Sequence, residues 1–299
     1  MIPPSVEKGA SGHPSSLVPP PFRCGRFVLD LRRPLVMGIV NVTADSFSDG
    51  GRFLDPQHAV AAARRLVAEG ADIVDIGAES TRPGSLPVPE DLEWQRLEPV
   101  LSALADLDCP VSVDTRHPWV MARAVAAGAS IINDVEGFRT PAAVDAVAGT
   151  TVGLVVMHMK GEPRTMQQAP HYDDVVAEVC DFLRLQRDLL ETRGVARDRV
   201  CLDPGFGFGK SLAHNLTLLA RLDALRELAC PILVGMSRKS MVGGLTGLPV
   251  AERLGSSIAA ALAAVARGAH IVRVHDVAQT AAALTVWKAV QDESSIPAG

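Results

Sequence analysis

Short apolar runs alternate with longer amphipathic segments along most of this chain. The apolar runs are rich in Val, Ile and Leu without polar alternation, as expected of strands that helices cover. Strict alternation of strand and helix predicts a parallel sheet, because each return to the sheet needs a crossover connection. The predicted strands are 35–40, 73–76, 111–113, 131–132, 153–157, 200–202, 232–234 and 271–274, and the predicted helices are 57–69, 91–107, 117–126, 142–148, 173–193, 212–228, 250–266 and 278–290.

The number of strand–helix units predicts the fold class. Eight units within about 275 residues favour an α/β fold of the (β/α)8 TIM-barrel type over an open sheet. We expect one domain over residues 26–292, a disordered extension rich in Pro, Ser and Gly over residues 1–25, and a tail over residues 293–299. Glycines that precede strands are expected to end helices in the left-handed conformation: Gly70, Gly128, Gly149, Gly194 and Gly268.

Charge and cysteine usage limit the partners and the location of the protein. The net charge is −5, from 29 Lys and Arg against 34 Asp and Glu, which argues against binding to nucleic acid or to an anionic membrane. The five cysteines are scattered and form no C-x-x-C pair, which argues against disulfides and structural zinc. No window approaches 18 uncharged apolar residues, and the N-terminus does not resemble a signal peptide. We therefore expect a cytoplasmic protein.

Polar side chains lie late in, or after, all eight predicted strands. In a parallel barrel these positions lie on one rim, the carboxyl-terminal face, where barrel enzymes have their active sites. One such residue alone is more simply a helix cap, but eight of eight favour a site. The residues are Asn41, Asp75, Asp114, Asn133, His158, Asp203, Lys239 with Ser240, and Arg273 with His275. Asp75 and His158 could also be purely structural.

The rim divides by charge. Its carboxylates and amide come from the third, fourth and sixth strands, and its cations follow the seventh and eighth strands, where this fold often binds phosphate. We therefore expect a ligand whose anionic end is bound by cations and a divalent metal, and whose heterocyclic end offers N–H donors to the carboxylates. The first group is Asp114, Asn133 and Asp203, and the second is Arg238, Lys239, Arg273 and His275.

A glycine-rich segment, residues 205–211, resembles a nucleotide-binding loop but fails both common patterns. The G-x4-G-K-S pattern requires glycine where Pro204 stands, and G-x-G-x-x-G requires glycine where Lys210 stands. The glycines more simply permit a tight turn that brings Phe208 against a flat ligand. A Schiff-base role for Lys239 in an aldolase-type barrel is a weaker alternative, because other cations surround this lysine in the sequence.

Together these motifs resemble the dihydropteroate synthase family of pterin-binding TIM barrels. The matching segments occur in order, at every predicted strand end, between about residues 35 and 290. They are residues 41–51, 77–84, 112–115, 132–134, 158–159 with 165–167, 203–210, 235–240 and 273–276.

The resemblance implies a transferase that uses Mg²⁺. In this family p-aminobenzoate displaces diphosphate from (7,8-dihydropterin-6-yl)methyl diphosphate and gives 7,8-dihydropteroate, and sulfonamides mimic p-aminobenzoate. We expect a dissociative path, in which diphosphate leaves first. The implied catalytic residues are Lys239, Arg273 and His275. The implied pterin-diphosphate residues are Asn41 (through the metal), Thr81, Asp114, Asn133, Asp203, Lys239, Arg273, Val274 and His275. The implied p-aminobenzoate residues are Thr81, Arg82, Pro83, Phe208 and Ser240.

Two alternative functions fit part of this pattern. A pterin-binding methyltransferase would share the barrel and the Asp and Asn pocket, but it would not need the cations after the last two strands. A catalytically silent scaffold is expected to lose some of the rim charges, and this rim keeps them. We further expect a homodimer, because the apolar helices at residues 256–266 and 278–290 could form a subunit interface.

Overall fold

The computed structural model describes residues 21–42, 56–79, 85–162 and 165–291. Within them, eight parallel strands pair in the order β8-β7-β6-β5-β4-β3-β10-β9. A parallel bridge between Leu202 and Ile232 joins the two ends of this sheet, so the barrel is closed. The predicted (β/α)8 barrel is confirmed. The strands are β3 (Leu35–Asn41), β4 (Ile73–Gly77), β5 (Val111–Asp114), β6 (Ile131–Asp134), β7 (Gly153–Met157), β8 (Val200–Asp203), β9 (Leu233–Val234) and β10 (Ile271–Val274).

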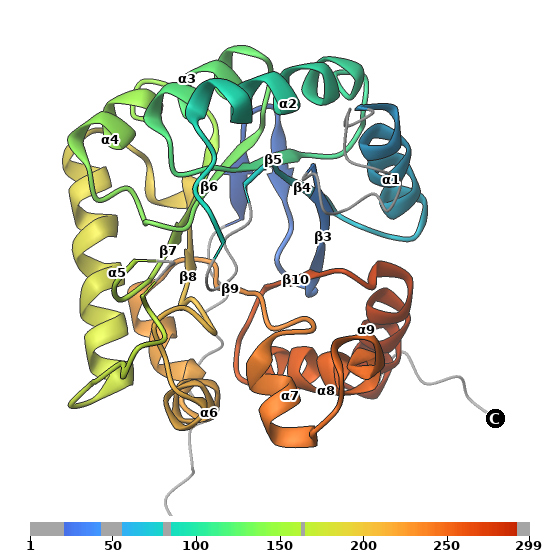
Figure 1. Ribbon diagram of the computed structural model, residues 1–299, viewed down its shortest axis with the longest axis vertical. Helices are drawn as coiled ribbons and strands as arrows, with labels where there is room; N and C mark the ends of the chain where they lie inside the picture. Colours follow the sequence, from blue (N-terminus) through green and yellow to red (C-terminus); the bar gives the residue numbers. More distant parts are fainter. Residues whose placement is uncertain (1–20, 43–55, 80–84, 163–164, 292–299) are drawn as a thin grey trace, which may run out of the picture.

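Helices form a ring around these strands (Figure 1). They are α1 (Pro56–Ala68), α2 (Glu90–Ala103), α3 (Pro118–Ala126), α4 (Pro141–Val147), α5 (Val175–Thr192), α6 (Leu212–Ala220), α7 (Ser240–Thr246), α8 (Leu254–Val265) and α9 (Val277–Gln291). Short 3-10 helices cover Arg197–Arg199, Leu222–Leu228 and Val250–Glu252.

The structure corrects some of the predicted helices. The helix predicted over 212–228 divides at Arg221 into α6 and a 3-10 helix, and the one predicted over 250–266 begins as a 3-10 turn before α8. The sequence did not predict α7, which contains two glycines and no apolar periodicity. Four of the five predicted glycine caps have positive φ, whereas Gly149 does not.

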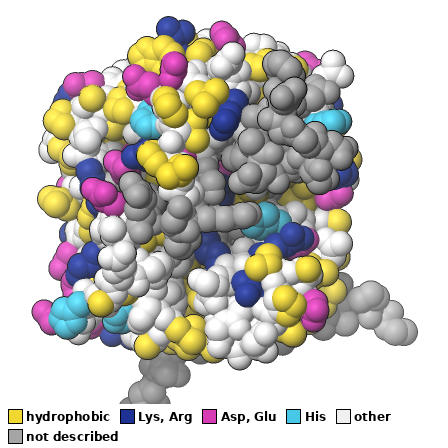
Figure 2. Space-filling view, viewed as in Figure 1, with side chains coloured by type: hydrophobic (Ala, Val, Ile, Leu, Met, Phe, Trp, Pro, Cys, Tyr) yellow, Lys and Arg dark blue, Asp and Glu magenta, His cyan; other side chains and the backbone are white. Residues whose placement is uncertain are grey.

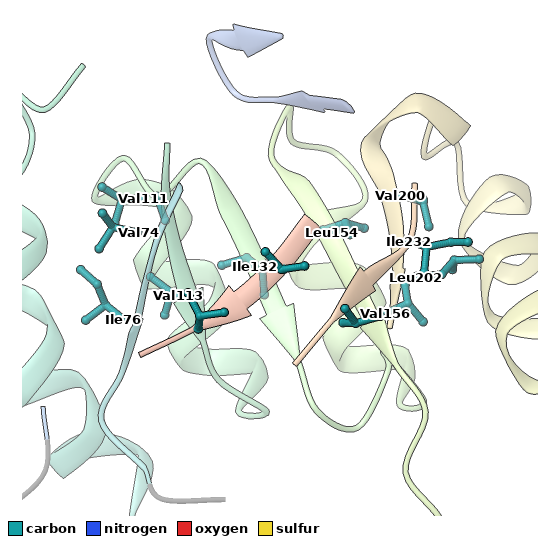
Figure 3. Close-up of a cluster of buried hydrophobic side chains, with 14 of the residues drawn as sticks. Val74, Ile76, Val111, Val113, Ile132, Leu154, Val156, Val200, Leu202 and Ile232 are labelled. Carbon is teal, nitrogen blue, oxygen red and sulfur yellow. The ribbon is translucent and has the colours of Figure 1, made fainter. Parts of the chain in front are cut away.

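Side chains alternate between the two faces of each strand and so build two apolar layers. One layer fills the space between strands and helices, where Val74, Ile132 and Leu154 are fully buried (Figure 3). The other layer fills the barrel interior and includes Met37 and Ile271. The interior layer is apolar only toward the amino ends of the strands, so the polar positions nearer their carboxyl ends can form a site.

An antiparallel hairpin of β1 (Phe22–Cys24) and β2 (Phe27–Leu29) covers the amino-terminal end of the barrel. Phe22 and Cys24 are fully buried in the same cluster as the interior strand residues. A Cβ at Gly153 would lie 2.7 Å from the Phe22 ring, so glycine is required at the start of β7 for the hairpin to pack. Residues 22–25, which were predicted to lie in the disordered extension, therefore belong to the folded domain. No helix within the described ranges is long and apolar enough to cross a membrane.

Candidate active site

A polar layer lies directly above the apolar residues of the barrel interior. Asp75, Asn133, Asp203 and Arg273 each come two residues after an interior apolar residue of β4, β6, β8 and β10, so they point into the same interior. Asp114 ends β5 and is in contact with this layer through Arg273. The structure therefore brings together side chains that are up to 198 positions apart in the chain.

Arg273 lies between two carboxylates. Its Nε donates to Oδ2 of Asp75 at 2.6 Å, and its Nη2 donates to Oδ2 of Asp114 at 2.7 Å. The same Asp75 oxygen accepts from Nδ2 of Asn133 at 3.3 Å, while Asp75 Oδ1 is buried without a hydrogen-bond partner among the described residues. Sequence reasoning left Asp75 open as a structural residue. The signal that could have identified it is an acidic residue inside an otherwise apolar strand.

Lys239 and Asp203 form the second part of the site. Lys239, which precedes α7, donates from Nζ to the backbone carbonyl of Phe206 at 2.6 Å and lies 4.5 Å from the centre of the Phe208 ring. Asp203 accepts from the backbone amide of Gly205 at 2.7 Å through Oδ1. The second carboxylate oxygen of Asp203 can therefore accept a hydrogen bond from a flat ligand. The Phe208 ring, with Lys239 over it, can pack against the same ligand.

Burial and neighbouring charges shift the pKa values of this cluster. Burial raises the pKa of Asp203, and the nearby Lys239 and Arg273 oppose that shift. Burial likewise raises the pKa of Asp114, against the opposing effect of Arg273. Burial lowers the pKa of Lys239 to about 8, although Asp203 opposes the shift. Burial alone would lower the pKa of Arg273, but Asp75 and Asp114 outweigh it and raise that pKa.

Carboxylates line much of this cluster. Asp75 and Asp114 pair with Arg273, and Lys239 and, more weakly, Lys210 act on Asp203. The site is therefore complementary to a ring that carries several N–H donors, since each donor would satisfy a carboxylate oxygen in a place where water is scarce. Asp203 and Arg273 both point into the barrel interior, from β8 and β10, and Arg273 opposes the rise in the pKa of Asp203.

Other predicted residues lie around this cluster. Asn41 ends β3 and is half-buried, and Ser240 begins α7 and is exposed. His275 follows β10, and its Nδ1 lies 3.1 Å from Oγ of Ser237, a residue that sequence reasoning had placed only within a motif. Lys, Arg and His side chains gather beside the grey segments near the middle of the molecule in Figure 2.

Not every predicted residue lies in the cluster. Val274 packs in the layer between strands and helices, on the opposite face of β10 from Arg273, so it could contact a ligand only through its backbone. Arg238, expected among the rim cations, forms an ion pair with Asp276 instead. Its backbone amide donates to Oγ of Ser257 in α8. Thr81, Arg82 and Pro83 lie outside the described residues, as does the predicted tail.

The described residues offer few donor groups for a metal ion. No group of three His, Cys, Asp or Glu residues in the described segments could hold a metal ion. Asn41 offers one amide oxygen at the end of β3. Mg²⁺ commonly takes only one or two protein oxygens and completes its coordination with phosphate and water, so this donor is compatible with the ion but does not define a site.

A closed barrel with a ring of acidic and basic side chains inside its carboxyl end is the architecture of a barrel enzyme. The model of the family described as "Pterin binding enzyme" matches residues 37–275. Among curated proteins, dihydropteroate synthase of Escherichia coli K12 is 48% identical over 262 residues, which are 87% of this chain and 93% of that protein. The synthase of Neisseria meningitidis serogroup C is 49% identical over 274 residues, 90% of this chain and 97% of that protein.

Solved structures give the same result. Dihydropteroate synthase of Xanthomonas albilineans with 4-aminobenzoic acid has a TM-score of 0.86 and 52% identity, covering 93% of this chain and 100% of that chain. The Burkholderia cenocepacia enzyme complexed with 7,8-dihydropteroate has a TM-score of 0.84 and 50% identity, covering 92% and 98%. The chain therefore belongs to the dihydropteroate synthase family, and it is a transferase.

Proposed function

We propose that the chain joins p-aminobenzoate to (7,8-dihydropterin-6-yl)methyl diphosphate and releases 7,8-dihydropteroate and diphosphate. The observation that carries the proposal is the interior cluster in which Asp75 and Asp114 hold Arg273, while the loop at Gly205 and Phe206 binds both Asp203 and Lys239. Relatives at about half identity that bind 4-aminobenzoic acid or 7,8-dihydropteroate support it.

The acidic residues would bind the pterin ring. Asp114 and Asp203 offer carboxylate oxygens to its N–H groups, Asn133 offers an amide, and Lys239 donates to a ring acceptor. The carboxylates of the cluster would also stabilise a positively charged methylene carbon on the ring. This favours a path in which the C–O bond to diphosphate breaks before the arylamine nitrogen attacks.

The cations would bind the departing diphosphate. Arg273 and His275 lie at the end of β10, and Ser237 fixes His275 through a contact of 3.1 Å. Preorganised donors of this kind each contribute roughly 3 to 4 kcal/mol to the stabilisation of a developing charge. Mg²⁺, held in part by Asn41, would neutralise charge on the diphosphate when bound.

The p-aminobenzoate would lie on the same side as Phe208 and Ser240. The Phe208 ring, whose centre lies 4.5 Å from Nζ of Lys239, provides an apolar surface, and the exposed Ser240 provides a hydroxyl at the start of α7. Thr81, Arg82 and Pro83 are expected to complete this part of the site. We extend the proposal to sulfonamide binding there, because a Yersinia pestis relative at 44% identity forms a sulfonamide drug complex.

An assay of diphosphate release tests the proposed reaction. We expect release to require the pterin diphosphate and Mg²⁺, and to speed up when p-aminobenzoate is added, since the amine traps the cation and prevents return. No release under any combination would refute the proposed function. Binding of methyl-tetrahydrofolate without diphosphate release would instead indicate the methyltransferase alternative.

The homodimer and the cytoplasmic location also stay proposals. Val286 and Val290 on α9 are 66% and 67% exposed, which supports a subunit interface on that helix. Light scattering should give twice the chain mass for the wild type, and Val286→Glu should give monomers. A monomeric wild type at micromolar concentration would refute the dimer.

A further inference from the structure

The loop between β8 and α6, residues 204–210, is bent by three glycines in the left-handed region. Gly205, Gly207 and Gly209 have φ of 68°, 82° and 62°. A Cβ at Gly205 would lie 1.9 Å from the carbonyl oxygen of His158, and one at Gly209 would lie 2.1 Å from that of Lys160. Glycine is therefore required here by conformation and by space, and the resulting backbone turns its carbonyls toward donor side chains.

Lys210 is buried against this loop and is only 2% exposed. Its Nζ donates to the carbonyls of Gly205 at 2.9 Å and Phe208 at 3.1 Å, and lies 2.9 Å from Nδ1 of His158. Burial lowers the pKa of His158 to about 2, so this imidazole is neutral and its Nδ1 can accept a hydrogen bond. Nζ of Lys210 also lies 3.4 Å from the carbonyl oxygen of His158, so four acceptors surround this group. Burial lowers the pKa of Lys210 to about 7, so the side chain is fully an ammonium ion only below that pH.

The two loop carbonyls that accept from Lys210 are those of Gly205 and Phe208, and between them in the sequence lies the carbonyl that binds Lys239. Phe206, which stands between them, accepts from Nζ of Lys239 at 2.6 Å. The amide of Gly205 donates to Asp203 at 2.7 Å. Because one short loop makes all of these contacts, a shift of its backbone would move the partners of both Lys239 and Asp203.

We propose that Lys210 is a positioning residue for the pterin site, whose ammonium group fixes the 204–210 loop so that Asp203 and Lys239 keep the geometry that binds the ring. This inference rests on the proposed function. It also explains why the segment looks like a phosphate-binding loop without being one. A phosphate-binding loop points its N–H groups at an anion, whereas this loop points carbonyl oxygens at two ammonium groups, those of Lys210 and Lys239.

Charge adds to the effect of geometry. Burial raises the pKa of Asp203, and the groups that oppose the shift are Lys239, the Gly205 amide, Arg273 and Lys210. Removal of the Lys210 ammonium therefore raises the pKa of Asp203 further. A lysine far from Asp203 would not move this pKa, so the pH profile reports the charge effect of Lys210, while hydrogen exchange reports its effect on the loop.

The test compares Lys210→Met, which keeps the chain length and removes the donors, with Lys160→Met. Lys160 is a nearby lysine that bonds to Glu178 and to the His171 carbonyl and not to the loop. Calorimetry with (7,8-dihydropterin-6-yl)methyl diphosphate should show about 10- to 100-fold weaker binding for Lys210→Met, and an acid limb moved to higher pH. Lys160→Met should stay within about threefold of the wild type.

His158→Phe is the second variant, for use if Lys210→Met does not fold. It keeps an aromatic ring against Phe182 but removes one acceptor of the ammonium, so we expect a loss of about three- to tenfold in affinity. Unchanged affinity and an unmoved acid limb in folded Lys210→Met, or unchanged affinity in His158→Phe, would overturn the proposal.

Hydrogen exchange keeps this inference separate from the proposed function. Amides of the 204–210 loop should exchange faster in both variants than in the wild type, with no ligand present. If the wild type does not bind the pterin diphosphate, the proposed function fails, and the exchange rates still report whether Lys210 holds the loop. Equal exchange in wild type and Lys210→Met would show that it does not.

Discussion

Replacement of Asp75 by Asn tests whether the buried carboxylate positions Arg273. The variant keeps the size of the side chain and an oxygen that can accept from Nε of Arg273, but it removes the negative charge. In the structure Asp75 is fully buried, its Oδ2 lies 2.6 Å from Nε of Arg273, and Asp114 holds the same guanidinium at 2.7 Å.

The magnitude follows from these contacts. Breaking a buried ion pair costs about 3 to 5 kcal/mol, and losing a hydrogen bond to a charged group costs about 1.5 to 3 kcal/mol. Since Asn retains an acceptor and Asp114 still pairs with Arg273, we expect the lower range, about 2 kcal/mol in the free energy of unfolding. If the orientation of Arg273 loses the same amount in the transition state, kcat/KM falls roughly 30-fold.

The assay combines urea unfolding with diphosphate release across pH. Because the charge of Asp75 raises the pKa of Asp114, the acid limb of kcat/KM should move to lower pH in Asp75→Asn. Asp198→Asn is the matched control, since Asp198 pairs with the more exposed Arg23 at 2.8 Å, far from the site, and should cost less than about 1 kcal/mol. Wild-type kcat/KM in Asp75→Asn, with an unmoved acid limb, would refute the positioning role.

Other variants test separate parts of the structure. Arg273→Ala should lower kcat about 100- to 1000-fold in the diphosphate-release assay, and a loss below about threefold would exclude a catalytic role. Asp203→Asn should weaken pterin-diphosphate binding at least about tenfold by calorimetry with an unchanged circular dichroism spectrum; equal binding would remove Asp203 from the pocket. Lys239, whose pKa burial lowers to about 8, should lose its proton above that pH, so kcat/KM should fall there, and Lys239→Met should lack this limb. Phe22→Ala should reduce the free energy of unfolding by about 3 to 5 kcal/mol while kcat/KM of the folded enzyme stays near wild type; the reverse pattern would contradict a purely structural hairpin.

Local patterns were sufficient to predict most of the fold. The strands were predicted because each apolar run is buried on both faces, and the helices because their amphipathic periodicity is long. The hairpin at Phe22–Cys24 was missed because it follows a Pro-rich stretch and is stabilised only by the barrel end that it covers. Helix α7 was missed because Gly243 and Gly244 interrupt any helical pattern.

Part of the candidate site could likewise be predicted from the local sequence. The order of residues along the chain places Asn41, Asp114, Asn133, Asp203 and Arg273 near the carboxyl ends of strands, and parallel strands bring these ends to one rim. The family-specific motifs then indicated which small molecules such a rim would bind. These inferences need only local sequence and the direction of each strand.

Only the folded chain decided which charges meet. Asp75 and Arg273 come from strands that are distant in sequence, and the pairing of β3 with both β4 and β10 brings Asp75 Oδ2 within 2.6 Å of Arg273 Nε. Lys210 binds the loop that precedes it, together with His158 from the end of another strand. Pairing between buried charges depends on distances across the barrel and on the exclusion of water there, and neither quantity is encoded in the local sequence.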